Sequence, residues 1–374
     1  MSERNGMKTS YPCECEGIED RKEVLRGVDE LFASAKEYAS SSRFLELMEF
    51  AGRFKQYAPY NAMLIYLQRP GARFVLSPRE WQKQYGRVVL KDKRPILILA
   101  PNGPLRCLFD VTDTQVKPGL SSDSFPPELA QPFENDGGAP VSAGLLHTLE
   151  ERLADLGICH GTMRTGENFA GKIEVGGEGD PDVQIAVAKG KAIRWRPAYS
   201  IRVSEDASDT AKFCSILHEL GHLLCRHLVD AYAGKWKVRR IAHGAQEFEA
   251  ESVAWLVARR QGVDSPSYRY LADYIETQGE IPDGTSVEEI MKAVSRIERM
   301  LAHRGEALDF FCAHSLPGLQ GRVEKAGKPG GYPPQPEWPG KRVTRASRMK
   351  ERSWMPVWKQ RRQTRSAGMC GESA

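Results

Sequence analysis

The sequence predicts a two-domain α+β protein with a basic tail, and three observations support this prediction. The chain has 374 residues, 41% of them hydrophobic and 27% charged, which is typical of a soluble protein with more than one core. Patterns of short strands and of amphipathic helices occur in both halves. A segment over 117–140, rich in Pro, Ser, Gly and Asp, is typical of a linker. We therefore expect a flexible N-terminal tail over 1–22, domains over 23–116 and 141–305, and a basic, Pro- and Gly-rich tail over 306–374.

The first domain is expected to place helices before strands. Apolar residues near helical spacing predict helical structure between residues 21 and 69, and its last piece, over 60–67, should end before Pro70-Gly71. Ser77-Pro78 has the pattern of an N-cap followed by proline in the first turn, so another helix should begin there. Apolar runs predict strands over 74–76, 96–100 and 105–111.

The second domain is expected to combine a small antiparallel sheet with a group of helices. An amphipathic pattern near 145–156 predicts its first helix, and strand patterns follow. The predicted strands lie over 172–175, 183–187 and 200–203. The predicted later helices lie over 209–229, 245–260, 268–276 and 287–303. Beyond Leu316 proline, glycine and basic residues dominate, so we expect a disordered tail.

The helix over 209–229 contains a metal-binding motif, His218-Glu219-Leu220-Gly221-His222. Histidines four apart on a helix project from one face, where their ring nitrogens can bind one tetrahedral Zn²⁺ ion. Glu219 lies beside the open coordination position and can transfer a proton as general base and acid. The same pattern occurs in charged surface turns, but leucines make much of this helix apolar, and a buried helix rarely tolerates three unpaired ionisable groups. The motif therefore predicts one zinc ion per chain, with Glu219 as the catalytic residue.

A catalytic zinc site needs a third protein ligand and an open fourth position. His227 lacks the H-x-x-G-x-x-H spacing of one class of zinc peptidases, so we interpret it as a surface or core histidine. His243 precedes the next helix and ranks second as a candidate. The next helix itself carries Glu247, Glu249 and Glu251 and is the strongest candidate.

The glutamate helix resembles the second helix of the gluzincin metallopeptidases, which offers the pattern E-x-x-[A/S]-[D/N/E]. Glu247-Phe248-Glu249-Ala250-Glu251 fits this pattern. The resemblance implies that Glu247 binds zinc and that Glu251, one turn further on, orients a ligand histidine without binding the metal itself. Glu249 and His243 are the alternative metal ligands. The second domain is thus expected to be a gluzincin-like zinc metallopeptidase domain.

Three stretches of the first domain resemble the N-terminal domain of ArdC-type antirestriction proteins. They are Tyr60-Asn61-Ala62-Met63-Leu64-Ile65-Tyr66-Leu67-Gln68-Arg69-Pro70, Trp81-Gln82-Lys83 and Ile96-Leu97-Ile98-Leu99-Ala100-Pro101. That family joins a domain that binds single-stranded DNA to a zinc metallopeptidase-like domain, and its relatives include the ImmA/IrrE regulators that act on repressors. The resemblance spans about residues 23–304. It implies that the protein has an antirestriction role and that its gene lies on a mobile element. The loop over 230–244 and the extra tail depart from the family pattern, so the resemblance does not imply a substrate.

Basic and aromatic side chains interleave in the first domain, as in proteins that bind single-stranded DNA. The basic ones are Arg53, Lys55, Arg69, Arg73, Arg79, Lys83, Arg87, Lys91, Lys93 and Arg94, and the aromatic ones are Tyr57, Tyr60, Tyr66, Phe74, Trp81 and Tyr85. Aromatic residues at helical spacing are also typical of a core, and lysine runs of a solvated face. The tail over 321–374 holds thirteen Lys and Arg against four Glu, so basic charge is concentrated there although the whole chain has a net charge of only +4.

We expect a zinc metalloendopeptidase that hydrolyses a peptide bond in a protein partner, such as a repressor or a defence protein, and binds single-stranded DNA through its first domain. The strand over 200–203 would align the substrate by β-augmentation. Tyr232, Arg239 and His243 are the candidates for stabilising the oxyanion. The alternative is a non-proteolytic DNA-binding antirestriction protein with a structural zinc, but a structural site has no use for Glu219.

Localisation is expected to be cytoplasmic, without membrane association. No apolar run is long enough to span a bilayer, and the N-terminus lacks the pattern of a secretory signal. The eight cysteines show no C-x-x-C spacing, which fits reduced thiols better than a disulfide framework.

Overall fold

The computed structural model describes residues 41–100, 103–117, 138–164, 170–176, 183–187, 191–195, 197–229, 237–265, 267–302 and 323–325. They form a mixed α and β structure with small sheets, and no helix among them has the length and apolar character that crossing a bilayer requires. The described residues divide into two compact units. Unit 1 holds those over 46–117, and unit 2 holds 41–45 and those from 138 onward. The predicted N-terminal tail, most of the predicted linker and most of the predicted basic tail lie outside the described residues.

From residue 41 onward, unit 1 contains the helices and strands predicted for the first domain, and the part of the predicted helical stretch before residue 41 lies outside the described residues. Its helices are α2 (Ser41–Arg53, whose first residues belong to unit 2), α3 (Pro59–Gln68) and α4 (Pro78–Tyr85). One antiparallel sheet has the order β1 (Val75–Leu76), β4 (Gly103–Asp110), β3 (Ile96–Ala100). The predicted helix start is confirmed: Ser77 and Glu80 form a capping box, in which each side chain accepts the backbone N–H of the other. A second pair, β2 (Arg87–Val89) and β5 (Thr114–Val116), was not expected, because three-residue strands carry too little periodicity to be recognised.

The main sheet of unit 2 is mixed, so the prediction of an antiparallel sheet is wrong for one of its pairs. The strand order is β6 (Ile158–Met163), β10 (Tyr199–Ser204), β7 (Gly171–Val175). β10 runs parallel to β6 and antiparallel to β7. β6 was not predicted because its sequence, Ile-Cys-His-Gly-Thr-Met, has no alternation of apolar and polar residues. β10 is therefore the central strand, and in the described chain β7 forms one edge.

A second sheet in unit 2 involves the region predicted to be a disordered tail. β8 (Val183–Val187), β9 (Lys191–Trp195) and β11 (Val323–Lys325) pair antiparallel in the order β11-β9-β8. The expectation of disorder is wrong for the three residues of β11, because β8 pairs with only one side of β9 and the backbone groups on the other side of β9 pair with β11.

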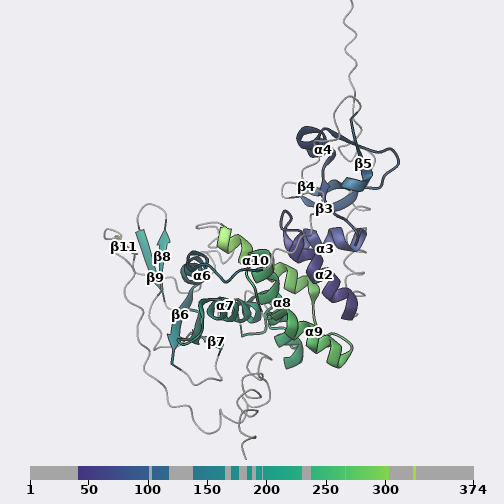
Figure 1. Ribbon diagram of the computed structural model, residues 1–374. Coiled ribbons are helices and arrows are strands. Elements are labelled where there is room, and N and C mark those ends of the chain that lie inside the picture. The colour runs from purple at the N-terminus through teal and green to yellow at the C-terminus, as the bar shows by residue number, and fades with distance from the viewer. Residues whose placement is uncertain are drawn as a thin grey trace, which may run out of the picture. The chain divides into compact units, whose positions relative to one another are not determined.

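The described part of unit 2 also contains five helices, and α7 lies between the mixed sheet and α8 (Figure 1). They are α6 (Ala143–Asp155), α7 (Asp209–Leu224), α8 (His243–Arg260), α9 (Ser267–Gln278) and α10 (Val287–Ala302). α7 begins at the N-cap Ser208, whose hydroxyl accepts the backbone N–H of Ala211. It ends five residues earlier than predicted, because Arg226 adopts a left-handed backbone with φ of 64° and turns the chain.

The closest approach of α7 and α8 occurs at Gly221. A Cβ atom at this position would lie 2.8 Å from the Cα and 3.0 Å from the carbonyl oxygen of Ala250. Both of these atoms belong to the backbone of α8, so no side-chain rotation can make room. The glycine inside the metal-binding motif therefore sets the separation of the two helices that carry the predicted ligands.

Replacing Gly221 with alanine is expected to destabilise the protein by about 1–3 kcal/mol, because the helices must separate to admit a methyl group. This loss outweighs the gain of about 1 kcal/mol that alanine brings to a helix interior. Urea unfolding of the purified protein measures the difference. The matched control is Gly144→Ala in α6, where nothing lies within 4 Å of the new Cβ. The control should be as stable as the wild type or slightly more stable, and a Gly221→Ala protein that behaves in the same way would contradict the close packing.

Candidate metal centre

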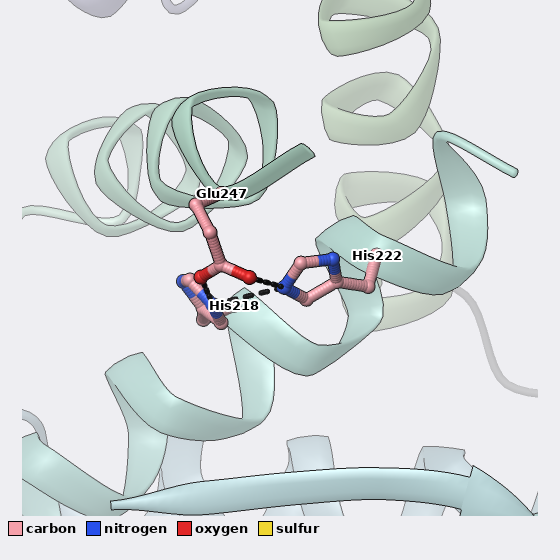
Figure 2. A group of neighbouring side chains, drawn as sticks. All are labelled: His218, His222 and Glu247. Atoms are coloured by element: carbon pink, nitrogen blue, oxygen red, sulfur yellow. Dashed lines mark hydrogen bonds and ion pairs between the residues drawn. The ribbon is translucent and has the colours of Figure 1, made fainter. Parts of the chain in front are cut away.

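Three side chains from α7 and α8 bring their donor atoms together in unit 2 (Figure 2). The Nε2 atoms of His218 and His222 are 3.1 Å apart. Each Nε2 atom is 3.3 Å from a carboxylate oxygen of Glu247. The histidines lie one turn apart on α7, and Glu247 reaches them from the first turns of α8, so the helix contact at Gly221 creates the cluster.

The donor separations match those that a small tetrahedral cation requires. Ligands at 2.0–2.1 Å from one tetrahedral ion are about 3.3 Å from each other. The side chains of the two histidines and of Glu247 are only 11–17% exposed, so their lone pairs also need a cation or protons to lower the repulsion between them and the cost of desolvation. His218, His222 and Glu247 therefore form a group that could hold a metal ion.

The outer ring nitrogens of both histidines are already hydrogen bonded, which directs the Nε2 atoms toward the centre of the cluster. Nδ1 of His218 lies 2.8 Å from an oxygen of Glu251, one turn beyond Glu247 on α8. Nδ1 of His222 lies 3.1 Å from Nδ1 of His227. Outer partners of this kind fix the orientation and the tautomer of ligand histidines.

Electrostatics within the cluster favour the charged forms of His218 and Glu247. Burial works against the positive charge of His218, but hydrogen bonds to Glu247 and Glu251 outweigh burial and raise its pKa well above the ordinary value. Burial likewise works against the negative charge of Glu247, yet its hydrogen bonds to His218 and His222 lower its pKa. Without a metal ion, these contacts favour a protonated His218 beside an ionised Glu247.

Glu219 lies on α7 facing the mixed sheet, with its side chain buried against β7. Burial raises the pKa of its carboxyl, while the charges of His218 and His222 and a hydrogen bond from the backbone of Ile173 counteract this effect. A carboxylate with a raised pKa is a stronger base than an exposed one. Glu219 thus has the environment that general acid–base chemistry requires.

The alternative ligands predicted from the sequence occupy other positions. Glu249 points away from the His218 and His222 cluster and is paired with Arg239. The side chain of His243 is 64% exposed, and its Nδ1 lies 3.6 Å from Glu247, at the rim of the cluster. Arg239, one of the predicted oxyanion donors, is held by Glu249, whereas Tyr232 lies outside the described residues.

A second group of metal-ligand side chains was not predicted. Cys225, His227 and Glu249 are buried and bring their donor atoms within 4.8 Å of one another. Burial lowers the pKa of His227, which favours its neutral form. His227 is thus a core histidine, one of the two predicted possibilities, but its contacts with His222 and Glu249 were not predicted. The spacing of these three residues in the sequence gives no sign of the contacts.

Comparison of the chain with protein-family models, with curated proteins and with solved structures finds no match in any of the three. The function must therefore be argued from the geometry and chemistry of the residues themselves.

Of the six aromatic residues of unit 1 that were predicted to stack on bases, three are buried and three are half-buried. Trp81 is fully buried, packs against Phe74 and Tyr85, and donates its indole N–H to the carbonyl of Phe109. Tyr57 and Tyr66 are buried as well. Most of the predicted basic residues are exposed, namely Arg53, Lys55, Arg73, Arg79, Lys83, Lys91, Lys93 and Arg94. Unit 1 thus exposes basic side chains on its surface, while most of the aromatic rings pack in or against its core.

Zinc affinity is expected to increase with pH up to the raised pKa of His218. Metals bind the neutral imidazole, so zinc must displace a proton from His218. Because the pKa of His218 is raised, a proton competes with zinc up to a higher pH than it would at an ordinary histidine. Displacement of one proton changes the affinity by about tenfold per pH unit. Competition with a chromophoric chelator at several pH values measures the slope. Glu251→Gln removes a charge that raises the pKa of His218, so in this variant the zinc affinity should stop rising at a lower pH. A wild-type affinity that does not change with pH would contradict His218 as a zinc ligand.

Proposed function

We propose that this protein is a zinc-dependent metallopeptidase of the gluzincin type. The observation that supports it most is the convergence of His218, His222 and Glu247, at separations that suit one tetrahedral zinc ion, beside the buried carboxyl of Glu219. Two imidazoles and one carboxylate are donors that suit zinc, and three protein ligands leave a fourth position for water or substrate. The sequence resemblance to ArdC-type proteins supports the same conclusion independently.

In the proposed reaction the residues of the chain bind, orient and move protons. His218, His222 and Glu247 would hold zinc, which when bound polarises the scissile carbonyl and lowers the pKa of water. Glu219 would accept a proton from the attacking water on a carboxylate oxygen and deliver it to the leaving amine nitrogen. Glu251 would keep His218 in the tautomer that binds metal through Nε2. His243, exposed at the rim, is the described candidate for stabilising the oxyanion.

The substrate would pair with β7, and not with residues 200–203 as the sequence suggested. Those residues lie in β10, whose two edges are occupied by β6 and β7, so no peptide can add to it. β7 has one edge without a partner strand among the described residues, and its Ile173 contacts Glu219. An extended peptide added to that edge would pass directly by the proposed catalytic group.

The proposed partner is a protein with an extended, accessible segment, such as a repressor or a defence protein. Single-stranded DNA binding by unit 1 is proposed on the resemblance to ArdC-type proteins and on its exposed cations, which suit phosphate contacts better than base stacking. The alternative, an antirestriction protein with only a structural zinc, leaves the buried Glu219 without a role.

Replacing Glu219 with glutamine is expected to reduce peptide hydrolysis by about 10²- to 10⁴-fold, because the amide cannot transfer the proton. Zinc content should stay near one ion per chain, since Glu219 is not a ligand. Cleavage of a fluorogenic peptide library and metal analysis by inductively coupled plasma mass spectrometry measure the two quantities.

The matched control is Glu276→Gln, which makes the same change on the exposed face of α9. It should retain both zinc and activity. Zinc should be absent from His218→Ala and strongly reduced in Glu247→Ala. A wild-type protein that binds zinc but cleaves no peptide would favour the structural-zinc alternative, and a Glu219→Gln protein with full activity would contradict the proposed role.

A further inference from the structure

A chain of polar contacts leads from His222 away from the proposed metal into the core between α7, α8 and α10. Nδ1 of His222 meets Nδ1 of His227 at 3.1 Å, and Nε2 of His227 meets a carboxylate oxygen of Glu249 at 2.9 Å. His227 follows the left-handed turn at Arg226, and its backbone N–H donates to the carbonyl of His222 at 2.9 Å. The turn at the end of α7 thus places His227 next to His222.

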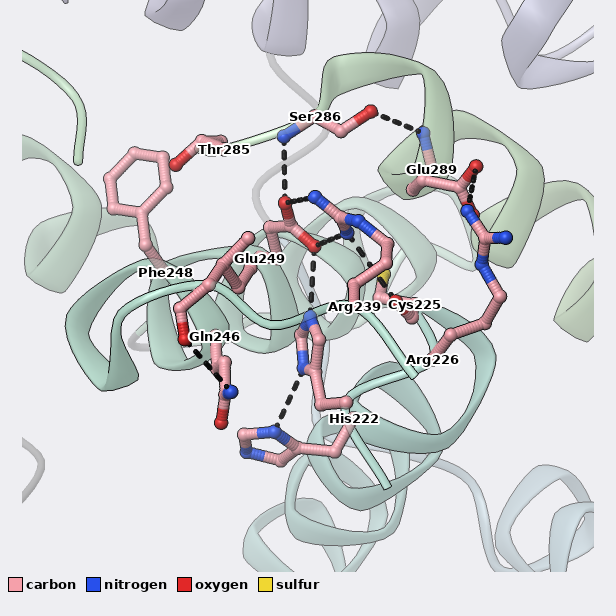
Figure 3. Close-up of polar contacts among 12 residues, drawn as sticks. His222, Cys225, Arg226, Arg239, Gln246, Phe248, Glu249, Thr285, Ser286 and Glu289 are labelled. Carbon is pink, nitrogen blue, oxygen red and sulfur yellow. Dashed lines mark hydrogen bonds and ion pairs between the residues drawn. The ribbon is translucent and has the colours of Figure 1, made fainter. Parts of the chain in front are cut away.

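Glu249 is fully buried, and its acceptor positions are filled by donors from three directions (Figure 3). Arg239 donates to both carboxylate oxygens, at 2.5 and 2.8 Å. The backbone N–H of Ser286, at the start of α10, donates at 2.6 Å. With His227 as the further donor, the roughly four lone-pair positions of a carboxylate are used.

These contacts define where the ring protons lie once a metal is bound. A neutral histidine that binds metal through Nε2 carries its proton on Nδ1, so His222 must donate to His227. Nδ1 of His227 must then accept, which leaves the proton of its ring on Nε2. Nε2 faces the carboxylate of Glu249, which can only accept. All the hydrogen bonds are satisfied by this single arrangement of protons.

The same contacts argue against a second metal ion at Cys225, His227 and Glu249. A cation there would lie beside the guanidinium of Arg239, which already neutralises Glu249. It would also need the Nδ1 or Nε2 lone pair of His227, and the two nitrogens are engaged by His222 and Glu249. The buried positive charge next to Glu249 is thus supplied by arginine.

We propose that His227, Glu249 and Arg239 form a positioning relay that holds His222 with its proton on Nδ1 and its Nε2 lone pair directed at zinc. The proposal rests on the proposed zinc site and extends it beyond the predicted ligands. Arg239 also donates to the carbonyls of Cys225 and Gly284, so the relay is anchored to the end of α7 and to the segment before α10. His222 thereby acquires an indirect carboxylate partner that corresponds to the direct partner of His218, Glu251.

The test compares two substitutions of His227 with different hydrogen-bonding capacity. In His227→Leu both contacts are lost, while Glu249 stays paired with Arg239 and Ser286, so the fold should survive. In His227→Gln the amide oxygen can accept from His222 and the amide nitrogen can donate to Glu249. Zinc affinity, measured by chelator competition, should fall by about 10- to 100-fold in His227→Leu and by much less in His227→Gln. The matched control is His160→Leu, which removes another buried histidine, on β6, and should leave the affinity unchanged.

A second measurement does not depend on any variant. The chain has eight histidines, few enough for their ring nitrogens to be assigned by ¹⁵N NMR of the zinc-loaded wild type. The relay requires a proton on Nδ1 of His222, none on Nδ1 of His227 and a proton on Nε2 of His227. A purely structural role of His227 would not require this pattern.

The outcomes separate the relay from the proposed function. One zinc per chain, the predicted proton pattern and a selective loss of affinity in His227→Leu support the relay. One zinc per chain with a protonated Nδ1 on His227, or with equal affinity in wild type and His227→Leu, overturns the relay and leaves the peptidase proposal standing. Two zinc ions per chain also overturn the relay, because the second group would then be a metal site. Wild type that binds no zinc overturns both.

Discussion

The contact between α7 and α8 at Gly221 is the constraint on which the rest of unit 2 depends. Only a residue without a side chain lets the backbone of α7 approach Ala250 this closely. At this separation a glutamate of α8 reaches between two histidines of α7 and meets both Nε2 atoms. A wider helix pair would leave three ionisable groups buried without partners, which costs several kcal/mol for each charge. Close helix packing and the polar cluster therefore require each other.

The three glutamates of α8 serve different purposes because helix geometry points them in different directions. Residues four apart lie on one face, so Glu247 and Glu251 both face α7 and meet the same histidine, on its two ring nitrogens. Glu249, two residues from either, lies about 200° around the helix and faces Arg239 and the start of α10. It still reaches the cluster indirectly, because the chain turns at Arg226 and places His227 between Glu249 and His222. Each histidine is thereby supported from outside by a buried carboxylate.

Unit 1 shows how one residue pattern can have two physical meanings. Its alternating cations and aromatic rings suit a single-strand-binding surface, and they suit equally a small hydrophobic core with a solvated exterior. Trp81, Phe74 and Tyr85 pack together, and the indole N–H of Trp81 bonds within the protein. The cations remain on the surface. Contact with nucleic acid through unit 1 would thus depend on charge, with strong sensitivity to salt, more than on stacking.

The sequence by itself determined the features that depend on neighbours along the chain. The spacing of His218 and His222, the capping box at Ser77 and the positions of the longer helices follow from helical periodicity and local hydrogen bonding, which act over a few residues. The choice of Glu247 and Glu251 among the three glutamates came from the resemblance to the gluzincin pattern, because local spacing alone left Glu249 and His243 open as well. Only the tertiary structure decided that β10 is the central strand and β7 an edge strand of the described sheet, that β6 pairs parallel with β10, and that His227 joins His222 to Glu249. These features arise from contacts between residues distant in sequence or across a turn, whose partners no local pattern specifies.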